Sequence, residues 1–101
     1  MVSKYFAIVS FELNDKDLLE DWKALSKEID EDIAKADGFI SRDSGVDESG
    51  RVYCLVKWQS EAHQQNFRQQ LEARESWPKT MERFGTIANM STMTPNNLEV
   101  F

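Results

Sequence analysis

The sequence is poor in the residues that build disulfides and metal centres. Its 101 residues include one cysteine, Cys54, and one histidine, His63. A lone cysteine cannot form an intramolecular disulfide, and one Cys with one His falls short of the four ligands of a structural zinc site. We therefore expect no metal and a reducing, cytoplasmic compartment. The sequence also has no glycine-rich phosphate loop and no Gly-x-Ser-x-Gly elbow, which argues against P-loop and α/β-hydrolase chemistry.

Long apolar runs and blocks of like charge are missing as well. No stretch approaches the roughly 20 apolar residues of a membrane span, and the start "MVSKYFAIVSFEL" is too short and too alternating for a signal peptide. The net charge of -6 argues against nucleic acid or an anionic membrane as the main partner. The length of 101 residues is typical of one domain with one core, so we expect a single domain over residues 1–101.

What the chain does contain is a regular order of strand and helix patterns. Strands are predicted over 4–12, 39–46, 51–58 and 89–94, and helices over 15–36, over 61–74 and from 76 onward. Gly38 is placed to cap the first helix at its C-terminus. With the last two helical stretches counted as one, the order is βαββαβ, the ferredoxin-like arrangement. It predicts an α+β fold in which an antiparallel four-stranded sheet carries its helices on one face.

The stretch "RVYCLVKWQSEAH" has too few polar residues for a strand with one solvent-exposed face. Apolar residues fall on both of its sides: Val52, Cys54, Val56 and Trp58 on one, Tyr53 and Leu55 on the other. Monomers rarely expose a large apolar patch, so we predict a homodimer with its sheets packed face to face. Alternatively, Tyr53 and Leu55 lie under the C-terminal segment 98–101 of the same chain, whose role the sequence leaves open.

The segment "DGFISRDSGVDESGRVYCLVKWQSEAHQQNF" resembles the antibiotic biosynthesis monooxygenase domain. The shared features are a helix ending in Gly38-Phe39, a hairpin, and a strand ending in Trp58-Gln59-Ser60 before the next helix. By order of elements the resemblance covers nearly the whole chain. It implies a dimeric α+β barrel built from two ferredoxin-like units.

The resemblance implies three kinds of function, because members of this family differ in chemistry. Some oxygenate anthrones or quinols without metal or cofactor, some degrade haem, and some are binding or uncharacterised proteins. The haem pattern fits poorly, since the first strand has Phe6, Ala7 and Ile8 and no Asn. Phe67 and Trp77 also fall near the positions of the pocket Trp and the haem-ligating His. We expect a cofactor-independent monooxygenase acting on a small aromatic. The alternative is a non-catalytic small-molecule-binding or dimeric interaction module, and whether the chain is an enzyme is left open.

Few side chains are suited to such chemistry. His63 is the natural base by pKa, although a partly exposed surface histidine is the commoner case. A small apolar or aromatic ligand is expected between the helices and the sheet. Its predicted lining is Trp22, Phe67, Trp77, Met81 and Arg42. Arg42 can stabilise an anion there, but a surface pairing with one of the nearby acidic residues Asp43, Asp47 and Glu48 is the more frequent outcome.

Overall fold

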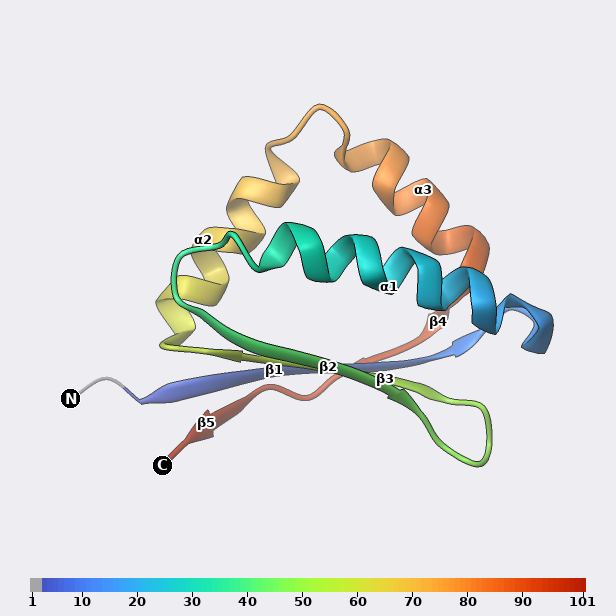
Figure 1. Cartoon of the computed structure of the whole chain (residues 1–101), viewed down its shortest axis with the longest axis horizontal. Helices are drawn as coiled ribbons and strands as arrows, with labels where there is room; N and C mark the ends of the chain where they lie inside the picture. The colour runs from blue at the N-terminus through green and yellow to red at the C-terminus, as the bar shows by residue number, and fades with distance from the viewer. Residues whose placement is uncertain (1–2) are drawn as a thin grey trace.

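An antiparallel sheet and a layer of helices form the computed structural model, which describes residues 3–101 (Figure 1). The elements are β1 (Lys4–Leu13), η1 (Lys16–Leu18), α1 (Leu19–Ile33), β2 (Phe39–Val46), β3 (Val52–Trp58), α2 (Glu61–Glu72), α3 (Trp77–Ile87), β4 (Ala88–Pro95) and β5 (Leu98–Val100). The sheet order is β2-β3-β1-β4, and β5 also pairs with β1. The predicted ferredoxin-like fold is thus confirmed. Among the described residues, no helix is both long and apolar enough to cross a membrane.

The first helical segment differs from its predicted span at both ends. Asp15 Oδ1 accepts a hydrogen bond from the Asp17 N–H at 2.9 Å, which holds the chain in the tight turn η1 before α1 begins. At the other end α1 stops at Ile33, three residues early, and a turn leads to Gly38 at φ 81°. The turn carries the chain back to the sheet, so Gly38 ends the turn rather than the helix itself.

The hairpin between β2 and β3 forms as predicted. Asp47 Oδ1 accepts hydrogen bonds from the backbone N–H groups of Ser49 and Arg51 at 2.9 and 3.0 Å. Gly50 takes φ 90°, a conformation that side chains disfavour. The turn therefore fixes the register that pairs Val46 with Val52.

Two separate helices replace the single second helix of the simplest ferredoxin-like order. Ser60 caps α2, since its hydroxyl accepts from the His63 N–H at 3.3 Å. Pro78 lies in the first turn of α3, where its missing N–H has no cost. Figure 1 shows α1 running along the sheet while α2 and α3 rise from it to their connection.

The core between the layers contains two aromatic groups. In the first, Phe11 of β1 meets Trp22 of α1 at a centroid distance of 5.0 Å, and both rings contact Phe84 of α3. In the second, Trp58 lies 5.4 Å from Phe67 and 6.0 Å from the ring of Phe39. The sheet-facing side of α1 supplies the buried residues Trp22, Leu25 and Ile33.

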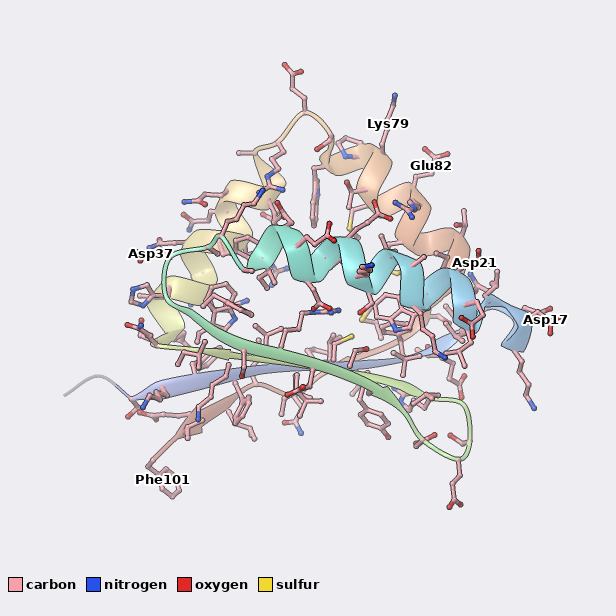
Figure 2. The ribbon with its side chains drawn as sticks, viewed as in Figure 1. Asp17, Asp21, Asp37, Lys79, Glu82 and Phe101 are labelled. Carbon is pink, nitrogen blue, oxygen red and sulfur yellow. The ribbon has the colours of Figure 1, made fainter. Side chains whose placement is uncertain are left out.

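The other sheet face carries no helix (Figure 1). On it, Ile8 of β1 pairs with Leu55 of β3, and Phe6 pairs with Leu98 of β5. The C-terminal segment thus extends the sheet beside β1 and does not cover its open face, where Tyr53 remains 37% exposed. Figure 2 shows Phe101 beyond β5, on the side away from the helices.

Candidate functional site

The predicted site residues lie in three different places. Trp22 and Arg42 belong to the contact between α1 and β2, His63 and Phe67 to the first half of α2, and Trp77 and Met81 to α3. Trp22 packs with the rings of Phe11 and Phe84, whereas Phe67 packs with Trp58 in the second aromatic group. One compact pocket lined by all of them is therefore not formed in the single chain.

The helix side of the sheet is incompletely covered in its middle. Ala7 of β1 and Val56 of β3 are direct cross-strand partners on this side, and both are only half-buried. Their neighbours along the strands, Phe11, Val52 and Trp58, are fully buried. Half-buried side chains also occupy the helices above: Phe67, Leu71, Trp77 and Met81. These side chains make the layer between α2, α3 and the sheet apolar and rich in aromatic rings.

His63 is held by contacts on both ring nitrogens. Its Nδ1 lies 2.7 Å from Ser60 Oγ, and its Nε2 lies 3.8 Å from the Asp37 carboxylate. The ring sits against Gly38, and its side chain is 31% exposed. Phe67 follows one turn later on the same helix face. His63 therefore lies one turn before Phe67 of the second aromatic group, with Nε2 near the Asp37 carboxylate.

Arg42 crosses from β2 to α1 through the interior. Its Nη1 donates to Ser26 Oγ at 2.8 Å, to the Ser26 carbonyl at 3.3 Å and to Asp30 Oδ1 at 2.7 Å. The Arg42 side chain is only 4% exposed, while the Asp30 side chain is 52% exposed. The expected surface pairing with Asp43, Asp47 or Glu48 was therefore wrong. Arg42 follows the alternation of β2 and points to the helix side, as does Ser44 two residues later.

Cys54 and Ser44 extend this polar network beneath α1. Cys54 Sγ lies 3.7 Å from both Arg42 Nη2 and Ser44 Oγ, and Ser44 Oγ accepts from Trp22 Nε1 at 3.4 Å. Burial raises the pKa of the Cys54 thiol, and the nearby Ser44 hydroxyl and Arg42 only partly oppose this. The thiol is thus buried and protonated at neutral pH, which makes it unreactive in the folded chain.

A groove of about 220 Å³ opens above this network, between α1 and β2. Its lining residues are Leu19, Trp22, Lys23, Ser26, Lys27, Asp30, Ser44, Gly45 and Val46. A second groove, of about 430 Å³, lies between the β2–β3 turn and the start of α1, with Leu13 and Asp47 in its walls. His63, Phe67, Trp77 and Met81 line neither groove.

Sequence reasoning missed the partners of Arg42. Ser26 and Asp30 follow Trp22 at spacings of four on α1, so the three share one flank of that helix. That spacing was readable, but nothing local shows that β2 crosses this flank. Within residues 3–101, no group of three or more His, Cys, Asp or Glu side chains is arranged to hold a metal ion.

Comparison with known proteins shows the fold. No family model matches the chain, and no curated protein matches its sequence. Among solved structures, SnoaB, a cofactor-independent oxygenase from Streptomyces nogalater, superposes with a TM-score of 0.74 at 10% identity, over 99% of this chain and 95% of that one. A protein from Nitrosomonas europaea, provisionally described as an antibiotic biosynthesis monooxygenase, gives a TM-score of 0.77 at 10% identity, over 98% and 91%. A conserved protein from Methanosarcina mazei Go1 gives 0.76 at 11%, over 99% and 95%. The predicted likeness to the antibiotic biosynthesis monooxygenases is thereby confirmed at the level of the fold.

Proposed function

We propose that this chain is a cofactor-independent monooxygenase that acts on a small aromatic of the anthrone or quinol class. Its fold is shared with SnoaB, a cofactor-independent oxygenase. At 10% identity that likeness concerns the backbone, so the chain's own residues must support the chemistry. The observation that carries the proposal is the half-covered apolar interior beneath α2 and α3.

The interior suits a flat, apolar ring. Phe67 and Trp77 offer aromatic faces, and Met81 offers a polarisable side chain that adapts to an irregular ligand. On the sheet, the paired residues Ala7 and Val56 are half-buried, and their small side chains would offer a bound ring little steric hindrance. A ring bound between these walls would be kept from water, which strengthens every polar contact made to it.

The reaction needs a proton acceptor more than any other group. Removal of a proton from an anthrone methylene gives an electron-rich anion that reacts directly with oxygen. One oxygen atom becomes the new carbonyl, and the other leaves as water with the two methylene hydrogens. His63 is the acceptor in this proposal: Ser60 holds Nδ1, Nε2 takes the proton, and Asp37 faces the resulting imidazolium.

The test is oxygen uptake with a panel of anthrones and quinols. We expect turnover by the wild-type chain and a loss of at least about a hundredfold in His63→Gln, because general base catalysis contributes on the order of 10²–10⁴-fold. The matched control is Gln65→Ala, an exposed residue of the same helix turn, which should keep full activity. Turnover that is undiminished in His63→Gln would remove this mechanism.

A second candidate is a non-catalytic module that binds the same ligands. It is favoured by one observation: the two polar candidates, His63 and Arg42, are both already engaged by partners within the chain. Quenching of Trp77 fluorescence by the panel, with no oxygen consumed by any compound, would establish this candidate and exclude the oxygenase.

We also propose that two copies pack through their open sheet faces. The apolar residues on this face belong to β1, β3 and β5: Phe6, Ile8, Tyr53, Leu55 and Leu98. Leu98 is 45% exposed in the single chain. Covering a contiguous patch of this kind stabilises a dimer because apolar surface leaves water.

A further inference from the structure

Arg42 is a buried cation that lies outside the proposed oxygenation site. Burying a guanidinium is costly unless charge and hydrogen bonds compensate it. Here the ionic compensation comes from Asp30, through a single bond at Nη1. On the surface of the same protein, Arg83 makes two bonds to the carboxylate of Glu28, at 3.0 and 2.6 Å. The buried arginine is therefore held by a carboxylate less completely than the exposed one.

Asp30 is also a partner that can move away. Its side chain is 52% exposed and stands on the wall of the α1–β2 groove, so it can turn into water without disturbing the core. Arg42 would remain anchored by Ser26, whose side-chain oxygen and carbonyl both accept from Nη1. The guanidinium is thus a fixed cation behind a displaceable carboxylate.

The rim of the groove adds further positive charge. Lys23 and Lys27 stand one turn apart on α1 and both line the groove. Lys23 lies 3.3 Å from Glu20, but both side chains are mostly exposed, so this pairing restrains Lys23 weakly. Among the residues that line the groove, Lys23 and Lys27 are cations and Asp30 is the one acid, while Arg42 lies behind Asp30 and does not line the groove itself. Charge in this groove is therefore complementary to an anion.

The opposite end of the groove is apolar. Leu19, Trp22 and Val46 form it, and Val46 is 45% exposed in the free chain. The groove's volume of about 220 Å³ lies below the 300–1,000 Å³ typical of sites for drug-sized ligands. The occupant would be a small molecule with one apolar body and one anionic group.

We propose that the α1–β2 groove is a binding site for a small aromatic or aliphatic carboxylate. The ligand carboxylate replaces Asp30 on Arg42 and is attracted by Lys23 and Lys27, while the apolar body covers Val46 beside Trp22. No residue of the proposed oxygenation site lines this groove. A negative result for carboxylate binding in this groove would therefore leave the oxygenation proposal unaffected, and the reverse also holds.

Benzoate is a suitable probe, with the neutral benzamide as its isostere. Isothermal titration measures affinity, and the Trp22 indole N–H resonance, assigned with Trp22→Phe, reports the location because this N–H points to Ser44 in the groove. We expect saturable benzoate binding that shifts the Trp22 signal, and benzamide binding at least about tenfold weaker, since charge-assisted hydrogen bonds are roughly twice as strong as neutral ones.

Three variants test whether the groove binds a carboxylate or whether the contact between Arg42 and Asp30 only stabilises the fold. Asp30→Asn removes the competing carboxylate, so benzoate should bind about tenfold more tightly even if the fold is less stable. Lys27→Gln should weaken binding about two- to fivefold, whereas Lys79→Gln, whose side chain projects from α3 into solvent (Figure 2), should leave it unchanged. The proposal is overturned if benzoate does not saturate, if benzamide binds equally well, if Asp30→Asn leaves the affinity unchanged or lowers it, or if the Trp77 indole shifts in place of that of Trp22.

Discussion

The imidazole of His63 lies where a side chain on Gly38 would have to be. A Cβ atom added at Gly38 would overlap the ring carbons Cγ and Cδ2 as well as Cβ of His63. The backbone of Gly38 also has φ 81°, in the left-handed region. The same glycine thus turns the chain into β2 and leaves space for the histidine that opens α2.

Gly38→Ala should therefore destabilise the fold for two reasons at once. The left-handed backbone costs a side chain roughly 1–2 kcal/mol, and the overlap with His63 adds to that cost. Gly50→Ala is the matched control, because Gly50 has φ 90° but open space around its Cβ position. Urea unfolding should show a greater loss of free energy of unfolding for Gly38→Ala than for Gly50→Ala. Equal losses would mean that the His63 ring moves aside freely.

Asp47 should make the stability of the hairpin depend on pH. Hydrogen bonds from Ser49, above all from its hydroxyl, together with those from the Arg51 N–H and the Tyr53 hydroxyl, hold the pKa of Asp47 below its ordinary value of 3.8. A carboxyl whose folded pKa is lowered contributes stability that is complete above its unfolded pKa and is lost as the pH falls through the folded value. The melting temperature of wild type should therefore exceed that of Asp47→Asn at pH 7, and the difference should shrink below about pH 3.8.

The neighbouring Glu48 provides the comparison for this experiment. Its side chain is exposed in the same turn, so Glu48→Gln should follow the wild-type melting curve across the pH range. A gap between wild type and Asp47→Asn that stays constant down to pH 2 would show that the carboxylate's charge does not stabilise the turn.

Local pattern was sufficient to predict the fold because each signal acts over a few residues. Trp22, Leu25 and Ile33 have the spacing typical of one buried helix face, and the residues between the strands predicted over 39–46 and 51–58 end in Gly50, which is typical of a turn. The end of α1 was predicted three residues late because Gly38 closes a turn whose path depends on contact with α2. The C-terminal strand was not predicted, since its pairing with Lys4–Phe6 joins opposite ends of the chain.

The candidate site was less predictable because its contacts span several elements. Trp22 and Arg42 do meet in one network, but through Ser44, Cys54 and Ser26. Arg42 looks like a surface residue in sequence, because three acidic residues follow it within six positions. Its true partner, Asp30, is twelve positions away on a helix, and only the packing of α1 on β2 brings the two together.

Cys54 should react with thiol reagents only when the fold opens. Its thiol is buried, and burial raises its pKa, so little thiolate is present at pH 8. We expect Ellman's reagent to modify the native chain at least about a hundredfold more slowly than the urea-unfolded chain. Fast, stoichiometric labelling of the native chain would show that the contact between α1 and the sheet opens readily.

The open sheet face makes a direct prediction about mass in solution. Light scattering at micromolar concentration should give twice the chain mass of 11.7 kDa if two sheets pack together. Leu55→Lys should lower the mass to that of one chain. In the single chain the new lysine would lie opposite Asp43 on β2, which favours the folded monomer, whereas in a dry interface its charge would be costly.

Met90→Lys is the control for this experiment. Met90 is 42% exposed but lies beside Gly85 of α3, off the open face, so this variant should keep the dimer mass. A wild-type mass of 11.7 kDa would exclude the dimer. Loss of the dimer in both variants would show that the two copies do not meet through the open sheet face alone.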